Sequence, residues 1–391
     1  MGKLVLKICG ATWDNASRDK RELSAYQELG ERVLVMAKGR KEDRGREEEV
    51  DGFPVRCCST RPLGDRFPAS LNRAASLFTW AHEARVLAPD VITGHDLLGL
   101  AIGWMSGLLR RNRPKLIYDS HEFELGRYTS RGAFRFFCVK HLERFLMNRC
   151  CFSIMVNDSI ADEVQRIHRL RERPVVVRST PNRWIVRESV CREVRESILE
   201  RFPEGVERLM MFHGCLGRGN GIETLIPLLA RHESLGLVLL GKQTDSRLIE
   251  EINSSAQALG VSDRILFLPA VDIEELWKYV GAVDVEMMLI EPIVKSYYYA
   301  LPNKLFEAIQ AETPMIASDL PEMKRIVEQY RIGLCCPPGD LEASDACLEK
   351  LLTDREFYRQ CRDNLRSAKE ELCWEKEKQI LTDAYVRTIG V

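Results

Sequence analysis

A segment in the second half of the chain places a cation and a carboxylate at the start of an expected helix. Asn303 and Lys304 follow a proline, and Glu307 comes one turn later in a helix expected to end near Ala311. In an alternating α/β chain such a helix begins beside the carboxyl ends of strands, where these sheets bind ligands. A helix N-terminus favours anions, so the backbone and Lys304 would hold phosphate while Glu307 holds hydroxyl groups. Together these groups could grip a nucleotide-sugar.

A second set of candidate residues lies in a glycine-rich loop, between a strand expected at 208–212 and a helix expected at 221–231. Glycine allows backbone N–H groups to approach a phosphate, because no Cβ stands in the way. The loop does not have the Walker pattern, which argues against an ATPase of that type. A flexible loop with helix-capping glycines is the alternative. The expected donor-binding residues here are Gly214, Gly217, Arg218, Gly219 and Asn220, with Arg218 supplying positive charge.

Two histidine–acid pairs follow strands expected in the first half of the chain. His95 and Asp96 follow the strand 91–93, and His121 and Glu122 follow the strand 115–119. All four would lie at the carboxyl edge of a sheet, where a histidine can donate or accept a proton near neutral pH. A purely structural role for each histidine stays open. Gly10 fits a tight loop at the same edge, but the dinucleotide pattern G-x-G-x-x-G is missing there.

Several other catalytic patterns are absent from the sequence. It contains no D-x-D, no cysteine–histidine cluster with metal spacing and no G-x-S-x-G. We therefore expect no metal and no cofactor, and no nucleophilic serine of the hydrolase type. The 13 cysteines include adjacent pairs but no C-x-x-C, which favours buried thiols in a reducing cytoplasm.

The N-terminal residues are expected to form a strand and not a signal peptide. The longest nearly apolar run, residues 97–109, has 13 residues. A membrane helix needs roughly 20. We therefore interpret this run as a buried helix.

Charge is unevenly distributed along a chain whose net charge is −1. Residues 1–185 hold 32 basic and 23 acidic side chains, and the remainder holds 25 and 35. The basic half suits an anionic membrane surface, or else simply attracts the acidic half. The segment 131–149 mixes phenylalanines with arginines, so it could be a helix lying on a membrane or one facing the core. Nothing in the sequence indicates nucleic acid as a partner.

Strands and helices alternate through both halves, which predicts parallel sheets with right-handed crossovers. The Pro/Asn break at residues 179–183 is the expected linker, and residues 38–51 are expected to form a charged loop. The tail, residues 370–389, is expected to be one helix anchored by Trp374. Expected strands are 4–9, 32–37, 91–93, 115–119, 153–156, 175–178, 208–212, 237–240, 265–268, 283–289 and 314–317.

Five blocks, in this order, resemble the retaining GT-B glycosyltransferases of family 4. The blocks are His95–Leu100, Tyr118–Glu122, His213–Leu216, Leu301–Glu307 and Cys373–Glu377. The resemblance implies an α/β fold with two Rossmann-like domains, whose parallel sheets face each other across a cleft. Residues 1–182 would bind the acceptor, residues 183–369 would bind the nucleotide-sugar, and residues 370–391 would form a helix packing back toward the first domain.

The resemblance also implies roles for particular residues. Glu307 is similar to the second glutamate of the E-x7-E motif, which holds ribose hydroxyls, and His121 is similar to a histidine that contacts the transferred sugar. The first glutamate would fall at Tyr299, and the usual phosphate-binding cations at Cys215 and Asn220. Arg218 and Lys304 are the candidates to replace those cations. The acceptor side would be formed by Gly10, His95, Asp96 and Glu122, and no metal would be required.

These observations predict a glycosyltransferase that moves a sugar from a UDP- or GDP-sugar to an acceptor hydroxyl with retention of configuration. The expected setting is surface polysaccharide or glycolipid synthesis, in the cytoplasm. The inner face of the plasma membrane is the place where a lipid-linked acceptor would be met. Two alternatives stay open. One is a nucleotide-sugar 2-epimerase of the same fold, and the other is a homologue that binds nucleotide-sugar without catalysis.

Overall fold

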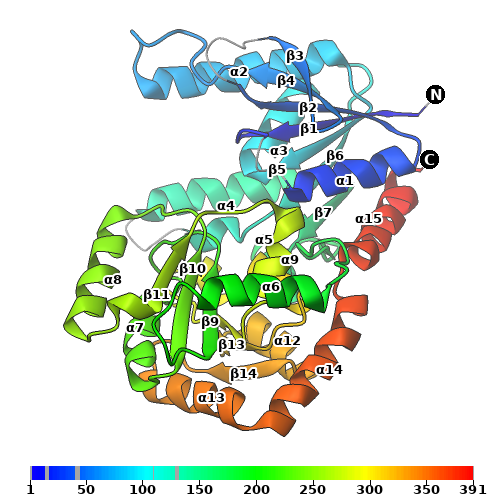
Figure 1. Cartoon of the computed structure of the whole chain (residues 1–391). Coiled ribbons are helices and arrows are strands. Elements are labelled where there is room, and N and C mark those ends of the chain that lie inside the picture. Colours follow the sequence, from blue (N-terminus) through cyan, green and yellow to red (C-terminus); the bar gives the residue numbers. More distant parts are fainter. Residues whose placement is uncertain (1, 14–16, 40–44, 109, 128–131, 391) are drawn as a thin grey trace. The chain divides into compact units, whose positions relative to one another are not determined.

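The computed structural model describes residues 2–13, 17–39, 45–108, 110–127 and 132–390. The chain divides into two compact units (Figure 1). The first unit comprises residues 1–178 together with residues 377–391, and the second comprises residues 179–376. The chain therefore passes from the first unit to the second near the expected Pro/Asn linker and returns near the tail.

The first unit is built on an eight-stranded sheet with the strand order β3-β4-β2-β1-β5-β6-β7-β8. All neighbouring strands are parallel except β3 and β4, which are antiparallel. Its strands are β1 (Leu4–Cys9), β2 (Arg32–Lys38), β3 (Glu47–Val50), β4 (Phe53–Cys58), β5 (Val91–His95), β6 (Lys115–Ser120), β7 (Phe152–Met155) and β8 (Val175–Val176). Its helices are α1 (Ser17–Glu28), α2 (Ala69–Leu87), α3 (Asp96–Ser106), α4 (Ala133–Met147), α5 (Asp158–His168) and most of α15 (Trp374–Ile389).

Helix α3 follows β5 without a loop, and two glycines make this possible. A Cβ on Gly94 would lie 2.4 Å from the backbone nitrogen of Leu100, and a Cβ on Gly99 would lie 2.5 Å from the backbone oxygen of Ile8. The close approach fixes His95 and Asp96 at the carboxyl edge of the sheet. The expected buried helix over 97–109 is thus α3, although Leu109 lies outside the described residues.

The expected charged loop over residues 38–51 is partly wrong. Residues 47–50 form β3, which pairs with β4 through a turn at Asp51 and Gly52. Both turn residues have positive φ, of 52° and 78°, as an Asp-Gly hairpin requires. The three glutamates of β3 are exposed, so this edge strand carries no apolar alternation that would predict it. Residues 40–44 lie outside the described part.

The second unit contains a six-stranded parallel sheet with the order β11-β10-β9-β12-β13-β14. Side chains of β9 alternate between two apolar layers: Leu209 and Met211 join one, and Met210 and Phe212 join the other. The strands are β9 (Arg208–His213), β10 (Leu235–Leu240), β11 (Ile265–Leu268), β12 (Val285–Met288), β13 (Met315–Ser318) and β14 (Gly333–Cys336). The helices are α6 (Glu188–Leu199), α7 (Ile222–Arg231), α8 (Ser246–Ala258), α9 (Ile273–Val280), α10 (Lys295–Tyr298), α11 (Asn303–Gln310), α12 (Pro321–Tyr330), α13 (Leu341–Thr353) and α14 (Arg355–Glu371).

The tail is two helices and not one, which corrects the prediction for residues 370–389. Helix α14 ends at Glu371, and α15 begins at Trp374 after a break at two buried residues. The backbone nitrogen of Trp374 donates to the carbonyl of Pro181 at 2.8 Å, so the break is held by the linker. Within the first unit, the Tyr385 ring lies 4.7 Å from the Tyr26 ring.

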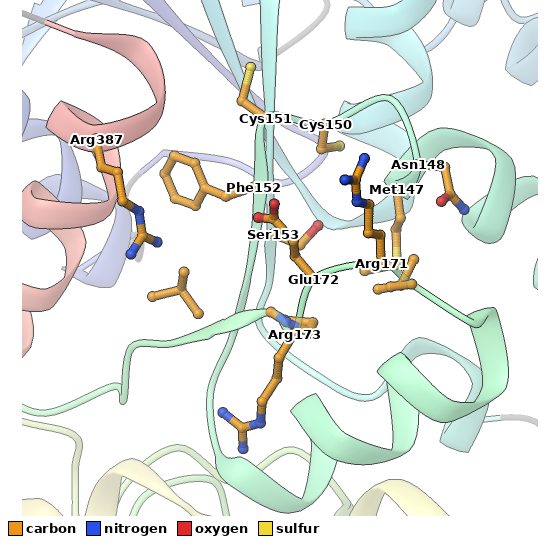
Figure 2. A pocket seen from close by; sticks show the side chains of 13 residues that line it. Met147, Asn148, Cys150, Cys151, Phe152, Ser153, Arg171, Glu172, Arg173 and Arg387 are labelled. Atoms are coloured by element: carbon orange, nitrogen blue, oxygen red, sulfur yellow. The ribbon is translucent and has the colours of Figure 1, made fainter.

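Among the described helices, none combines the length and the apolar character that a bilayer span requires. A pocket of about 220 Å³ in the first unit is lined by the segments that lead into β7 and β8, by the first residues of those strands and by Arg387 of α15, at the amino edge of the sheet (Figure 2). The candidate site residues of that unit lie at the opposite, carboxyl edge.

Candidate active-site residues of the two sheet edges

At the carboxyl edge of the first sheet, a buried lysine is surrounded by carboxylates. The Nζ of Lys7, on β1, lies 2.8 Å from Asp19 Oδ1 and 3.0 Å from Asp119 Oδ2, and it also contacts Glu22. Arg18 donates to Asp119 Oδ1 at 3.1 Å, which adds a second cation. The Lys7 side chain is fully buried, so its charge depends on these partners.

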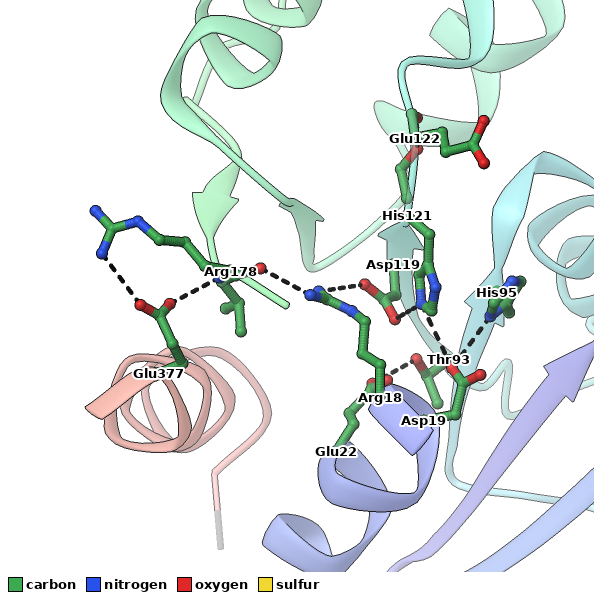
Figure 3. Close-up of polar contacts among 12 residues, drawn as sticks. Arg18, Asp19, Glu22, Thr93, His95, Asp119, His121, Glu122, Arg178 and Glu377 are labelled. Carbon is green, nitrogen blue, oxygen red and sulfur yellow. Dashed lines mark hydrogen bonds and ion pairs between the residues drawn. The ribbon is translucent and has the colours of Figure 1, made fainter. Parts of the chain in front are cut away.

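Both histidines predicted from the sequence join this cluster (Figure 3). His121 Nε2 lies 2.7 Å from Asp119 Oδ2, and His95 Nδ1 lies 3.1 Å from Asp19 Oδ1. The two rings are 3.9 Å apart. Burial alone would lower the pKa of His121, but the charge of Asp119 outweighs it and raises the pKa to about 9. His121 is therefore protonated at neutral pH and acts as a hydrogen-bond donor.

The acidic partners in the two sequence pairs are placed differently. Asp96 Oδ2 lies 3.5 Å from His95 Nε2, and the residue has a φ of +60° at the start of α3. Such a conformation is uncommon for a non-glycine residue and is often found at functional sites. Glu122 is exposed and accepts from Arg127 at 2.7 Å, so it does not join the cluster. A Cβ on Gly10 would lie 3.3 Å from Leu98 on α3.

Two groups at this edge have ligand atoms close enough to hold a metal ion. They are Cys9 with Asp19 and His95, and Asp19 with Asp119 and His121. Sequence spacing did not predict them, because each group joins Asp19 of α1 to at least one residue far along the chain. The ammonium of Lys7 already contacts Asp19 and Asp119 and supplies a positive charge there.

At the carboxyl edge of the second sheet, a histidine lies between two glutamates. His213, the last residue of β9, contacts Glu286 Oε1 through Nδ1 at 2.9 Å and Glu307 Oε2 through Nε2 at 2.8 Å. Burial would lower the pKa of His213, but Glu286 and Glu307 raise it to about 9. The protonated ring therefore fixes Glu307, one turn inside α11. Within the described part of the chain, no group bonds Oε2 of the buried Glu286.

Lys304 is a partly buried cation without a carboxylate partner among the described residues. Its Nζ lies 3.7 Å from the centre of the Phe212 ring and 3.4 Å from Asn220 Oδ1. Among the described residues, no carboxylate oxygen lies within 4.0 Å of this ammonium. Burial lowers its pKa to about 8, opposed by the more distant charges of Glu286 and Glu307. Because no carboxylate neutralises this ammonium, an anionic ligand can bind to it without displacing a protein group.

The glycine-rich loop packs closely over this edge. Gly214 has a φ of +113°, and a Cβ there would lie 3.9 Å from Cε of Lys304. Gly221, with a φ of +70°, could not carry a Cβ, because it would lie 1.9 Å from the carbonyl oxygen of Leu289. Glycine is thus required both by conformation and by space. Asn220 closes the loop on itself, donating to the carbonyl of Gly217 at 3.0 Å.

The other residues predicted around this loop are placed as follows. Arg218 is half exposed and is already held by three carboxylates, with its nearest contact to Glu251 at 2.5 Å. Asn303 and Cys215 are exposed. The Tyr299 ring, at the position of the missing glutamate, lies 5.6 Å from Lys295 Nζ. Of the two candidate cations, Lys304 is the one without an acidic partner.

Several buried charged residues that organise both sheet edges were not predicted from the sequence. Each strand concerned is apolar apart from one charged residue, as in Lys7 of β1 and Glu286 of β12. A charged side chain inside a buried strand needs a partner, so this pattern is a usable signal. Asp19 and Glu22 carried no such signal, because acidic residues in the first turns of a helix are common.

Two units with parallel sheets and crossover helices, each with its polar cluster at a carboxyl edge, form an α/β fold of the GT-B type. Solved structures share this fold. A sucrose-phosphate synthase from Thermosynechococcus elongatus is similar with a TM-score of 0.79 and 18% identity, over 99% of both chains. HepE from Anabaena, solved with UDP-glucose, gives a TM-score of 0.77 and 15% identity over 98% of this chain and 100% of HepE. A glycosyltransferase from Rickettsia africae gives 0.75 and 12%, over 99% of both.

Two family models match the chain side by side. The model described as Glycosyltransferase Family 4 matches residues 21–180, and the one described as Glycosyl transferases group 1 matches residues 196–368. Between them they span most of the sequence, so the chain belongs to the group 1 (family 4) glycosyltransferases. No curated protein sequence matches it significantly.

Proposed function

We propose that this glycosyltransferase moves a sugar from a nucleoside-diphosphate sugar to an acceptor hydroxyl, with retention of configuration. The observation that carries the proposal is the partly buried ammonium of Lys304, which has no carboxylate partner among the described residues and lies beside the glycine-rich loop. Charge develops on the leaving diphosphate in the transition state, and a preorganised cation in a buried site stabilises that charge strongly. A diphosphate beside Lys304 would also raise the pKa of this lysine back toward its ordinary value.

The donor would be held by groups from two segments of the second unit, the glycine-rich loop and α11. The backbone at Gly214 and Gly217 and the ammonium of Lys304 would contact the diphosphate, with the exposed Asn303 at the rim, whereas Gly219 is buried against Ile293 and Tyr297. Glu307 would accept from the ribose hydroxyls. One of its oxygens is bonded to His213, and a carboxylate has lone pairs for further donors. The His213–Glu286 pair would keep Glu307 in the orientation that this contact needs.

In the first unit, His121 would contact the transferred sugar as a donor. Its proximity to Asp119 keeps the ring protonated at neutral pH, which does not suit a general base. The departing diphosphate would then take the acceptor proton on the same face of the sugar, as retention requires. His95, Asp96 and Gly10 would line the acceptor side of this edge.

We also propose that transfer needs no metal ion. The cations that the chain supplies are Lys304 at one edge and Lys7 with Arg18 at the other. Turnover should stay unchanged after treatment with a chelator. A loss that added Mg²⁺ or Zn²⁺ restores would instead point to the two ligand groups around Asp19.

The decisive experiment combines a thermal-shift screen over UDP- and GDP-sugars with a transfer and hydrolysis assay. A donor at about 100 times its Kd should stabilise the protein by about 2.7 kcal/mol. The glutamate variant Glu307→Gln should weaken both binding and turnover, whereas His121→Asn should reduce turnover more than donor binding. Conversion of UDP-N-acetylglucosamine to its 2-epimer without an acceptor would favour the epimerase. Donor binding without transfer or hydrolysis would favour a non-catalytic homologue.

The proposed setting is synthesis of a surface polysaccharide or glycolipid, with the first unit at an anionic membrane. One face of α4 packs inward through Leu146 and Met147, while Phe134 is 81% exposed and Phe137 56% exposed. Exposed aromatic side chains on a helix with nearby cations suit a lipid interface. The fraction of protein that co-sediments with vesicles containing phosphatidylglycerol should be smaller for the double variant Phe134→Ser/Phe137→Ser than for wild type. An unchanged fraction would contradict the proposed membrane contact.

A further inference from the structure

A second polar pocket in the second unit lies at the edge opposite to the candidate donor residues. It has a volume of about 350 Å³ and is formed by α6, α14 and the amino ends of β9 and β12. Pockets that hold small ligands begin at about 300 Å³. Its charged lining consists of Arg192, Arg195, Arg208, Arg362, Glu188 and Asp284.

Two of these arginines are fixed by Asp284. Arg195 donates to Asp284 Oδ2 at 2.8 Å and also to the carbonyls of Ala282 and Glu207, and Arg208 donates to Asp284 Oδ1 at 3.0 Å. The backbone nitrogen of Leu209 donates to the same carboxylate at 2.8 Å. One carboxylate thus orients two guanidinium groups and neutralises only one of them.

The other two arginines come from facing helices and are weakly compensated. Arg362, on α14, lies 3.7 Å from Glu188, and that carboxylate is shared with Arg366 at 3.3 Å. Arg192, on α6, has no acidic partner among the residues that the structure describes. Four arginines therefore face two acids, which leaves the pocket with an excess of about two positive charges.

A hydroxyl group completes the lining. The ring of Tyr358 packs on the hydrophobic core, and the residue also lines the pocket. In the described part of the chain, no group bonds its hydroxyl. Burial raises the pKa of Tyr358 to about 12, so the phenol remains a donor at neutral pH. Fixed guanidinium groups and one free hydroxyl donor suit a tetrahedral oxyanion.

We propose that this pocket binds a small molecule bearing a phosphate group, at a site separate from the donor site. A phosphate monoester carries about −1.5 to −2 charges at neutral pH, which matches the excess in the pocket. The pocket and the donor residues lie at opposite ends of the same two strands. Arg208 begins β9 and His213 ends it, and Asp284 lies two residues before Glu286. The pocket in Figure 2 differs, because its Arg173 is held by Asp158 and Asp162 and its arginines are spread apart.

Isothermal titration of the full chain with inorganic phosphate at low salt tests the proposal. Wild type should bind phosphate, and Arg192→Ala/Arg362→Ala should bind about tenfold or more weakly, because charge-assisted hydrogen bonds are lost. Tyr358→Phe removes only the hydroxyl and should weaken binding several-fold. Neither change touches Asp284, Arg195 or Arg208, which hold the strand ends.

Two controls separate this site from the rest of the protein. Arg359→Ala removes an exposed arginine of the same helix that does not line the pocket, and it should bind like wild type. Lys304→Met removes the donor-side cation and should retain phosphate binding. The proposal is overturned if wild type gives no binding, if the double variant binds like wild type, or if binding is lost in Lys304→Met alone.

Discussion

The two carboxyl edges each hold a histidine bonded to two carboxylates, but they balance charge in different ways. In the first unit, Asp119 is shared by His121, Lys7 and Arg18, so two permanent cations accompany the histidine. In the second unit, His213 alone lies between its two glutamates, and Lys304 is placed on an aromatic ring without a carboxylate partner among the described residues.

This difference separates a closed network from an incomplete one. Removing a cation from the first edge leaves buried carboxylates facing one another, so the free energy of unfolding should decrease. Removing Lys304 from the second edge takes away a charge that the fold does not use, so the cost falls on ligand binding. The predictions below test this division.

The largest effect is expected from Lys7→Met. The change leaves three buried carboxylates with one fewer cation and should destabilise the first unit by about 3–5 kcal/mol. Hydrogen exchange of the β1 and β2 amides measures this within that unit. Lys20→Met is the matched control, because Lys20 pairs with the exposed Asp51 at the surface. Equal protection in the two variants would contradict a closed network.

Lys304→Met should act on turnover and not on folding. We expect kcat/KM for the donor to fall by about 10²–10³, the range seen when one charge-stabilising donor is removed. The unfolding midpoint should stay the same or rise, since a partly buried charge without a carboxylate partner among the described residues is lost. A lower midpoint with unchanged turnover would reverse the assignment.

The low pKa of Lys304 gives that prediction a further control. Wild-type kcat/KM should fall as pH rises through about 8, where the ammonium loses its proton. Lys304→Arg should be less active at pH 7 but should keep its activity above pH 8, because guanidinium stays charged.

His213 should make the stability of the second unit depend on pH. Its pKa is about 9 in the folded state and about 6.5 when unfolded, so its contribution is complete below pH 6.5 and is lost as pH rises through 9. Between pH 6 and 8 the loss should be about 2 kcal/mol. Above pH 8 the titration of Lys304 acts in the opposite direction. Denaturant unfolding of wild type and His213→Asn measures this, and equal slopes would contradict it.

The smallest effect is expected from Arg218→Ala. The guanidinium is about half exposed and held by Glu251, Asp245 and Glu223, so little of its charge is available for a diphosphate. Turnover should fall by no more than about threefold. A loss as large as that of Lys304→Met would show that both cations hold the donor, as the sequence alone suggested.

Much of the fold could be predicted from alternation, because buried parallel strands are almost continuously apolar. The strands expected at 4–9 and 265–268 have the bounds found in the structure. The β3 hairpin could not be predicted in this way, since its glutamates face solvent at a sheet edge. The break before Trp374 was hidden because Leu372 and Cys373 continue a helical apolar pattern while packing in the core.

The candidate site was predicted only where the chemistry is local in sequence. Lys304 and Glu307 lie one turn apart, so a single segment gives both. The pairing of His213 with Glu286 joins residues 73 positions apart on neighbouring strands. Such a contact depends on strand order, and the sequence of one chain does not give that order.

The return of the chain to the first unit sets an order on its synthesis. Arg178 ends the long segment of that unit, but its backbone nitrogen donates to Glu377 at 2.7 Å. Likewise, the ring of Tyr26 packs against Tyr385, which is synthesised much later. The ribosome must make the whole of residues 179–376 between these partners. The second unit can therefore complete its core before the first unit has received α15. Until α15 leaves the ribosome, the apolar surface of the first unit that this helix covers would be exposed to chaperones.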